Sequence, residues 1–404
     1  MKVLRIIPSM DPSSGGPCQG LRNIIPELEK LGIQNEVICL DDPSAPFIGT
    51  DSFTVHSLGP AKGPWRYSDR LIPWLVDNLE RFDVVIVHAL WLYHGYALRK
   101  AVQKINRTNK SADKINLPRI YIMPHGMLDP YFQKTEERKL KALRNWVYWK
   151  FIESKVVNNS DGLLFTCQAE LMLAREPFRP YHPQKEINIG YGVEAPPPFS
   201  ETMRAAFLEK CDEVKDQPFI LFLSRIHEKK GVDHLLEAYA KIKHRTKATN
   251  GVNALPKLVI AGPGMDTPYG EKMQAMVQET ASLNGSVFFP GMLTSEAKWG
   301  AFYGCDAFVL PSHQENFGIA VAEALACSKP VLISDQVNIW NEIIKSGAGI
   351  VSKDNTEGVE LLLNSWCSLP ISAREEMGEL ALACYQKDFA VKPAAERFCE
   401  MILT

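Results

Sequence analysis

Two glutamates lie eight residues apart across the junction between an expected strand and an expected helix. Glu315 follows the strand Ala307–Leu310, and Glu323 falls within a helix over Ala320–Cys327. One carboxylate can accept hydrogen bonds from two neighbouring hydroxyls, which suits sugar diols. Gly318 lets the backbone approach a ligand, and the first helix amides can donate to hydroxyl or phosphate oxygens. Either glutamate alone is an ordinary solvated or helix-terminal carboxylate, but the whole run predicts a site for a polyhydroxylated ligand.

A basic pair, Arg225 and Lys230, directly follows the expected strand Phe219–Leu223. Arginine binds phosphate oxygens in a planar, bidentate manner, and lysine supplies a point charge. Preorganised cations can stabilise the charge on a departing diphosphate without a metal ion. A plain basic loop is about equally common, and the position after a strand favours phosphate binding. No D-x-D motif occurs, so we expect neither a metal nor another cofactor.

Two weaker candidates in the first half of the chain are His125 and Gly16, each after an expected strand. The tight turn around His125 can project its ring, and a glycine at position 16 allows the backbone to approach an anion. Both are also compatible with plain turns, and His88 competes with His125 on position alone. His88 and His94 flank two aromatic residues, Trp91 and Tyr93, which either shape an acceptor pocket or cap the core.

Short β-branched runs alternate with helix-length segments, which is typical of parallel sheets covered on both faces. The strands expected in the first half are Val3–Ile7, Glu36–Leu40, Val84–His88, Ile120–Met123 and Gly162–Phe165. Those expected in the second half are Phe219–Leu223, Leu258–Ala261, Val287–Phe289, Ala307–Leu310 and Val331–Ser334, and the helices are Val232–Lys243, Glu271–Leu283 and Ala320–Cys327.

Three consecutive prolines, Pro196–Pro198, form a stiff linker that neither a helix nor a central strand can contain. We therefore predict an α/β fold with two doubly wound domains, 1–194 and 199–387, that face each other across a cleft. In such sheets ligands bind beyond the carboxyl ends of the strands.

Composition excludes several classes of protein. The 404 residues are 46% hydrophobic and 23% charged, and the net charge of -2 disfavours nucleic-acid binding. Nine scattered cysteines without a C-x-x-C pair fit reduced thiols, not a disulfide framework or a structural zinc site. No P-loop or G-x-G-x-x-G motif occurs. With no signal peptide or spanning helix visible, we expect a cytoplasmic protein, or one peripheral to the inner face of the cytoplasmic membrane.

The chain resembles the retaining glycosyltransferases of family four over much of its second half and at separate loops of its first half. These enzymes have the GT-B architecture of two facing Rossmann-like domains. Glu315 and Glu323 match the family's E-x7-E signature. This resemblance implies that Glu315 contacts donor-sugar hydroxyls and that Glu323 holds the ribose. Arg225 and Lys230 match the family's diphosphate-binding residues. His125 is similar to the histidine that faces the donor sugar.

The same resemblance implies that the Gly16 amide approaches the phosphate and that the C-terminal segment 388–404, with a helix over Ala394–Ile402, packs back on the first domain. The remaining residues that it places around the donor are Gly262, Gly264, Leu293, Asn316, Phe317 and Gly318. Two positions depart from the family pattern. Asn316 and Ser224 stand where relatives often have glycine, and the first departure bears on donor-sugar selectivity.

The resemblance implies a retaining, metal-independent hexosyltransferase that uses a nucleoside-diphosphate sugar. On family breadth, UDP-glucose is the first expectation for the donor and GDP-mannose the second, with a glycan or lipid-linked acceptor in polysaccharide biosynthesis. No enzymic nucleophile is evident, so front-side attack is the expected mechanism. The alternatives are a sugar-nucleotide epimerase of similar architecture, a non-catalytic nucleotide-sugar-binding protein, and an exported two-lobed sensor, which the missing signal peptide disfavours.

The segment 138–155 interleaves basic and aromatic side chains. Its basic residues are Arg138, Lys139, Lys141, Arg144, Lys150 and Lys155, and its apolar ones are Trp146, Val147, Tyr148, Trp149 and Phe151. Such a stretch can lie on an anionic membrane surface near a lipid-linked acceptor. The favoured interpretation is a helix whose aromatic face packs into the first domain, because consecutive aromatic residues cannot all point outward.

Overall fold

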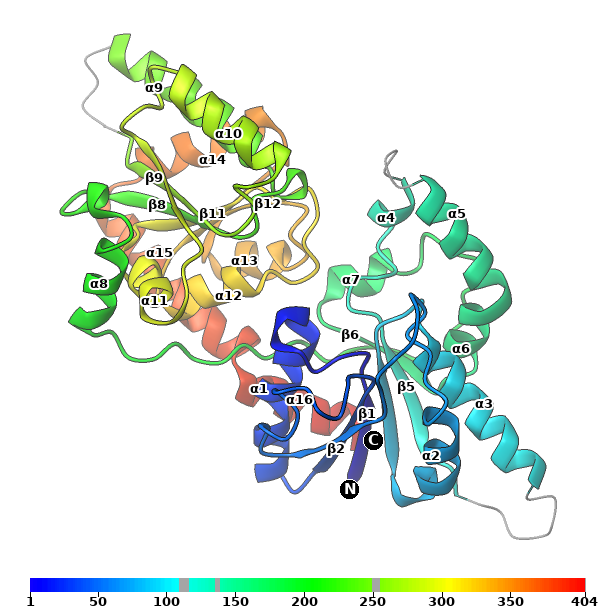
Figure 1. The fold of residues 1–404 in the computed structure, drawn as a ribbon. Helices are drawn as coiled ribbons and strands as arrows, with labels where there is room; N and C mark the ends of the chain where they lie inside the picture. The colour runs from blue at the N-terminus through cyan, green and yellow to red at the C-terminus, as the bar shows by residue number, and fades with distance from the viewer. Residues whose placement is uncertain (109–115, 135–138, 249–254, 404) are drawn as a thin grey trace. The chain divides into compact units, whose positions relative to one another are not determined.

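The computed structural model describes residues 1–108, 116–134, 139–248 and 255–403 (Figure 1). It consists of two compact α/β units: unit 1 is Met1–Gly192 with Val391–Thr404, and unit 2 is Val193–Ala390. The chain therefore changes units slightly before the proline linker and returns slightly later than the boundary expected at 387. Backbone pairing accounts for these boundaries, because Val193 forms a parallel bridge with Ala390 and its amide donates to the Phe389 carbonyl over 2.8 Å.

Unit 1 contains a parallel sheet with the strand order β3-β2-β1-β4-β5-β6-β7. Its strands are β1 Lys2–Ile6, β2 Gln34–Cys39, β3 Thr54–Ser57, β4 Val84–His88, β5 Arg119–Met123, β6 Gly162–Phe165 and β7 Glu186–Asn188. The five expected strands are present, with ends that differ by at most two residues. The two strands that the sequence missed, β3 and β7, are the sheet edges, and they are short and contain no fully buried residue.

Helices cover both faces of this sheet. They are α1 Gly16–Lys30, α2 Leu71–Asn78, α3 Tyr93–Thr108, α4 Tyr131–Lys134, α5 Lys139–Tyr148, α6 Ser154–Asn158, α7 Gln168–Leu173 and α16 Val391–Leu403. The C-terminal helix α16 lies beside α1 and buries Phe398 and Ile402 against Val3 of β1 (Figure 1). It begins three residues earlier than expected, because Pro393 is tolerated in a first turn, where no amide needs an intrahelical partner.

The basic, aromatic segment forms α5, a π-helical turn over Trp149–Glu153 and α6; Arg138 lies outside the described residues. Trp149 is buried and stacks on Phe178, so inward packing holds for this residue. It does not hold for Trp146 and Phe151, which are 51% and 62% exposed. The reason is geometric, since one helical segment cannot turn residues at all of these positions towards the sheet.

Unit 2 contains a parallel sheet with the order β10-β9-β8-β11-β12-β13. Its strands are β8 Phe219–Leu223, β9 Lys257–Ala261, β10 Val287–Gly291, β11 Ala307–Leu310, β12 Val331–Ser334 and β13 Gly349–Ser352. The strand order reverses between β8 and β11, which is the doubly wound arrangement in which ligands bind beyond the strand ends at the reversal. The missed strand β13 is again a partly exposed edge.

The helices of unit 2 are α8 Glu201–Leu208, α9 Val232–Ala248, α10 Pro268–Glu279, α11 Ser295–Gly304, α12 Ile319–Ala326, α13 Trp340–Ser346, α14 Thr356–Ser368 and α15 Ile371–Cys384. The helix expected over Glu271–Leu283 lies earlier, because the Thr267 side chain caps it by accepting from the Gly270 amide. None of the helices in the described ranges combines the length and the apolar character that crossing a bilayer requires.

Candidate active site

The candidate residues of unit 2 follow neighbouring strands at the carboxyl edge of its sheet. Arg225 and Lys230 follow β8, Gly262 and Gly264 follow β9, and Glu315 follows β11. Because β8 and β11 are adjacent and flank the strand-order reversal, their loops meet where doubly wound sheets bind ligands. Topology therefore brings together residues up to about ninety positions apart in the sequence.

Lys230 and Glu315 form an ion pair across this reversal. Lys230 ends a 3₁₀ turn over Glu228–Lys230, and its side chain is only 8% exposed, against 24% for Glu315. The two loops are joined a second time by the His313 amide, which donates to the Lys229 carbonyl over 2.9 Å. The pair thus holds a cation and a carboxylate in place before any ligand arrives.

The turn from Glu315 to Gly318 is fixed by the loop after β12. The Glu315 amide donates to the Gln336 carbonyl over 2.9 Å, and the Glu315 carbonyl accepts from the Asn338 amide over 3.0 Å. Gly318 has φ 83°, a left-handed conformation that favours glycine, and α12 starts at the next residue. Phe317 and Asn316 lie between these points; Phe317 is buried edge-to-face against Phe389, and Asn316 is partly buried.

Glu323 has a different partner from Glu315. Lys298 of α11 donates to its carboxylate over 2.6 Å, and the Glu323 side chain is 13% exposed. Burial raises the pKa of Glu323, and the Lys298 charge opposes this shift. The sequence did not point to Lys298, because it belongs to no motif and lies on a separate helix.

Close packing explains two of the candidate glycines. A Cβ at Gly262 would collide with the Ser224 carbonyl, and one at Gly264 with the Ile226 carbonyl. The Ile226 amide also donates to the Pro263 carbonyl over 2.8 Å. These contacts hold the backbone on both sides of Arg225 against the loop after β9. The Arg225 side chain itself is exposed. Leu293, in the loop after β10, is buried.

In unit 1, Gly16 is the first residue of α1, and Gly15 before it has φ 87°. The Tyr191 hydroxyl donates to the Gly16 carbonyl over 2.6 Å. Any side chain at Gly20 would collide with the Tyr191 ring, so this glycine is needed for the tyrosine to hold the start of the helix. Tyr191 could not be predicted from the sequence, because a single tyrosine far from Gly16 carries no local signal.

His88 and His125, which the sequence presented as rivals, are neighbours. His88 Nδ1 lies 2.9 Å from His125 Nε2, and the rings stack with centroids 5.2 Å apart. His94 donates from Nε2 to the His88 carbonyl over 2.7 Å. Burial lowers the pKa of His125 and of His94 to about 4, and that of His88 well below its usual value. At neutral pH His125 is therefore uncharged, and a neutral imidazole can both donate and accept a hydrogen bond.

Glu153 lies behind the loop after β4, and its burial should make the free energy of unfolding depend on pH. The residue is 2% exposed, and its carboxyl accepts a hydrogen bond from the Trp91 amide over 3.3 Å. Burial raises the pKa of Glu153 to about 8. Since the folded-state pKa is raised above the unfolded value, its contribution to stability is full at acid pH and is lost as the pH rises through about 8.

We therefore expect Glu153→Gln to lie within about 1 kcal/mol of the unsubstituted protein at pH 5 and to exceed its free energy of unfolding by about 4–5 kcal/mol at pH 9. Urea unfolding of both proteins at pH 5, 7 and 9 measures the difference, and the histidine contributions cancel because both proteins share them. Parallel stability profiles would show that Glu153 titrates normally.

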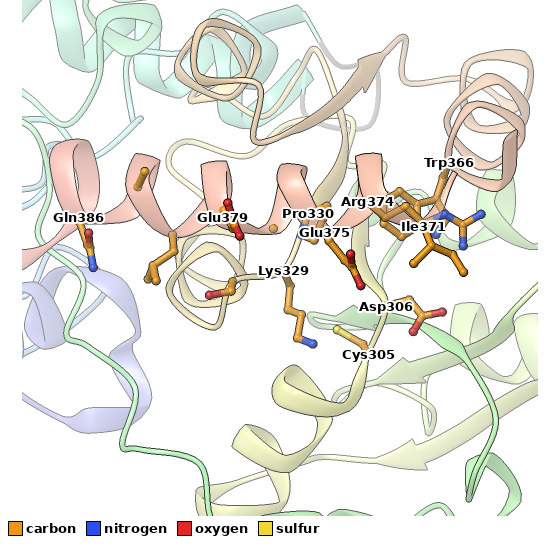
Figure 2. Close-up of a pocket in the computed structure, with 14 residues that line it drawn as sticks. Cys305, Asp306, Lys329, Pro330, Trp366, Ile371, Arg374, Glu375, Glu379 and Gln386 are labelled. Carbon is orange, nitrogen blue, oxygen red and sulfur yellow. The ribbon is translucent and has the colours of Figure 1, made fainter. Parts of the chain in front are cut away.

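A cavity of about 710 Å³ lies at the opposite edge of the unit 2 sheet (Figure 2). Its lining includes Cys305 and Asp306, which precede β11, Ser328–Pro330, which precede β12, and one face of α15. These are the amino ends of the strands, so the cavity is separate from the loops that carry the candidate residues.

Two family models match the chain. The model described as glycosyl transferases group 1 matches residues 204–382, and the model described as glycosyl transferase 4-like domain matches residues 15–187. Together they cover most of both units. The chain belongs to the group 1 glycosyltransferases. Members of this family transfer sugars, which is the class of activity that the resemblance implied.

Similar glycosyltransferases include α-D-kanosaminyltransferase of Streptomyces kanamyceticus, 28% identical over 49% of this chain and 48% of the relative. Trehalose synthase of Pyrococcus horikoshii is 26% identical over 64% of this chain and 60% of the relative. An uncharacterized glycosyltransferase of Methanocaldococcus jannaschii is 31% identical over 37% of each chain. The chain thus spans between about a third and three-fifths of the length of these relatives.

A solved structure confirms the fold class. HepE of Anabaena, in complex with UDP and glucose, matches with a TM-score of 0.71 at 15% identity and covers 100% of this chain and 99% of HepE. A glycosyltransferase from Rickettsia africae matches with a TM-score of 0.74 at 16% identity, covering 99% of this chain and 97% of the other. Likeness at this identity shows the fold alone, which is the GT-B class with two Rossmann-like units.

Proposed function

We propose that this glycosyltransferase is a retaining enzyme that moves a hexose from a nucleoside-diphosphate sugar to a glycan or lipid-linked acceptor in polysaccharide biosynthesis. UDP-glucose is the first candidate for the donor and GDP-mannose the second. The bond-breaking step needs no divalent cation. The enzyme works in the cytoplasm, at the inner face of the cytoplasmic membrane.

The observation that carries the proposal is the Lys230–Glu315 ion pair at the strand-order reversal of unit 2. A buried lysine at this position can stabilise the negative charge of a departing diphosphate. The adjacent carboxylate of Glu315 can accept hydrogen bonds from sugar hydroxyls. Arg225, exposed in the same loop as Lys230, adds a bidentate phosphate contact. Glu323 is the proposed ribose ligand, and the turn 316–318 borders the sugar.

In the proposed reaction the acceptor hydroxyl attacks the anomeric carbon on the face that the diphosphate leaves. The leaving phosphate oxygen takes the hydroxyl proton, so no enzymic nucleophile or base is required. Lys230 and Arg225 stabilise the diphosphate charge as the glycosidic bond breaks. Uncharged His125 supplies a hydrogen bond to the sugar, and the Gly16 amide approaches the phosphate. Gly262, Gly264 and Leu293 border the base.

The HepE complexes with UDP and glucose and with UDP-glucose support a uridine donor. A thermal-shift panel of nucleotide sugars tests this choice, because a ligand at 100 times its Kd stabilises by about 2.7 kcal/mol. We expect UDP and UDP-glucose to raise the melting temperature more than GDP and GDP-mannose. A response to the guanine nucleotides alone would reverse the assignment.

We also propose that α5 and the π-helical turn contact an anionic lipid surface. The exposed apolar side chains of this face are Leu140, Leu143, Trp146, Val147 and Phe151. Basic residues surround them, and the Lys150 ammonium lies 5.4 Å from the Trp146 ring and 5.9 Å from the Phe151 ring. Apolar side chains that insert into the headgroup region, with lysines that attract anionic lipids, are the two elements of interfacial binding.

Vesicle flotation tests this face. The protein is expected to float with vesicles rich in phosphatidylglycerol and to bind phosphatidylcholine vesicles weakly, since each basic residue near an anionic surface contributes about 1 kcal/mol. The double variant Trp146→Glu/Phe151→Glu should bind at least about tenfold more weakly, because two large apolar side chains no longer insert. Leu361→Glu, at an exposed leucine of α14 in unit 2, is the matched control and should bind normally. Equal binding by all three proteins would refute the assignment.

A further inference from the structure

Three side chains with metal-binding chemistry gather in unit 2: Asp233, His234 and His313. Each offers one ligand atom, and these atoms all lie within 4.8 Å of one another. Asp233 and His234 belong to the first turn of α9, and His313 lies in the loop after β11. All three are partly buried. Imidazole nitrogen and carboxylate oxygen are ligands that zinc prefers.

Hydrogen bonds outside the cluster fix the tautomers of both rings. His313 Nδ1 lies 2.9 Å from the Asp354 carboxylate, so this nitrogen carries the proton and donates. The Thr356 hydroxyl donates its one proton to Glu237 over 2.8 Å. His234 Nδ1, 2.8 Å from the same hydroxyl, must therefore donate to it. In its neutral form each ring therefore keeps an unprotonated Nε2, which is the form that binds a metal ion. The hydrogen bond to Asp354 raises the pKa of His313, so an ion that binds its Nε2 must compete with a proton as the pH falls.

Asp233 is held in the same way. The Tyr269 hydroxyl donates to its Oδ1 over 2.9 Å, which leaves lone pairs on the carboxylate for an ion. Each of the three side chains is thus oriented by a partner outside the cluster. Protein metal sites have this organisation, in which the far side of each ligand is hydrogen-bonded to a carboxylate, hydroxyl or carbonyl.

We propose that Asp233, His234 and His313 bind one Zn²⁺ ion, with water completing its coordination. Ligand atoms about 2.0–2.1 Å from a tetrahedral zinc ion lie about 3.3 Å apart. The observed atoms, within 4.8 Å of one another, therefore need to approach by at most about 1.5 Å to bind one ion. A hard ion such as Mg²⁺ is disfavoured, because it prefers oxygen ligands.

The ion would join the two loops that carry the Lys230–Glu315 pair. Asp233 lies three residues after Lys230, and His313 lies two residues before Glu315. The His313 amide already donates to the Lys229 carbonyl between the same loops. The zinc ion therefore acts as a structural clamp at the edge of the sheet. It has no part in the proposed departure of the diphosphate. The metal-independent transfer and the zinc clamp are therefore separate proposals, and a negative result for one does not refute the other.

The direct test is titration of the metal-stripped full-length protein with Zn²⁺ alone, followed by calorimetry and thermal unfolding. We expect one site per chain and a rise in the melting temperature of unit 2 of about 5–10 °C at a hundredfold excess over Kd. The double variant His234→Ala/His313→Ala should lose both responses. Asp354→Asn, which removes only the outer partner of His313, should weaken Kd by about 10–100-fold. His244→Ala replaces an exposed histidine of the same helix and should respond normally.

Anomalous diffraction at the zinc edge of the unsubstituted protein places the ion without any variant. A peak between the three side chains is expected. Absence of stoichiometric uptake by the unsubstituted protein would overturn the proposal. Uptake that persists in the double variant would also overturn it, because the ion would then be bound elsewhere. Donor binding is measured separately with UDP. The Zn²⁺ titration can therefore be interpreted even if the proposed function is wrong.

Discussion

Lys230→Ala is expected to lower kcat by about 100- to 1000-fold, because it removes a preorganised cation from the diphosphate as negative charge develops there. The side chain is almost fully buried and already paired with Glu315, so little reorganisation accompanies the reaction. The KM for the donor should change less than kcat, since the interaction strengthens as the bond breaks. Initial rates of donor turnover at saturating donor measure the effect.

The control is Lys229→Ala, at the adjacent position of the same loop. We expect its rate to remain within a few-fold of the unsubstituted enzyme. Folding must be measured in parallel, because Lys230→Ala leaves the Glu315 carboxylate without its ammonium partner. Glu315 keeps access to water, so the loss in free energy of unfolding should be only about 1–2 kcal/mol. An unchanged kcat in a folded Lys230→Ala variant would refute the diphosphate assignment.

Glu323→Ala is expected to weaken UDP binding by about 10–100-fold, the loss for one charge-assisted hydrogen bond to a ribose hydroxyl. At saturating donor, kcat should change far less than the affinity, because the ribose takes no part in bond breaking. Glu323→Gln keeps one acceptor oxygen and should fall between the two proteins. Titration calorimetry with UDP measures all three affinities.

The matched control for this substitution is Glu296→Ala on α11, whose carboxylate accepts from the Thr202 hydroxyl over 3.0 Å and which we do not place at the donor. Its UDP affinity should be unchanged. An equal loss in both variants would mean that the effect reports general destabilisation of unit 2. Normal UDP affinity in Glu323→Ala would refute the proposal that Glu323 binds the ribose.

The buried central strands could be predicted from the sequence because their signal is local. Val84–His88 and Ala307–Leu310 are continuous apolar runs, and both are strands with the expected bounds. The edge strands β3, β7 and β13 could not be predicted, because they are short and contain no fully buried residue. The fourth edge strand, β10, was predicted, because it begins with the apolar run Val287–Phe289 and Val287 is buried. The ends of helices were harder to predict, because they depend on capping residues such as Thr267, whose hydrogen bond to the helix start forms only in the folded backbone.

The candidate site likewise contains residues that could be predicted from the sequence and residues that could not. The position of Glu315 and Lys230 after strands followed from the sequence, and sheet topology then explains why they meet. The partners Lys298 and Tyr191 could not be predicted, since each reaches its contact from a distant element. The roles of His125 and Gly16 remain predictions. The cluster of Asp233, His234 and His313 also depends on long-range folding, because no local ligand spacing links position 234 to position 313.

The measurement that tests the central claim most directly is the stereochemistry of sugar release. Slow hydrolysis of UDP-glucose, with water as the acceptor and no added divalent cation, is followed by proton NMR from the first minutes. A retaining enzyme yields α-glucose before mutarotation forms the β anomer, and this is the result that we predict. Early appearance of β-glucose would contradict front-side attack and with it the proposed retaining transfer.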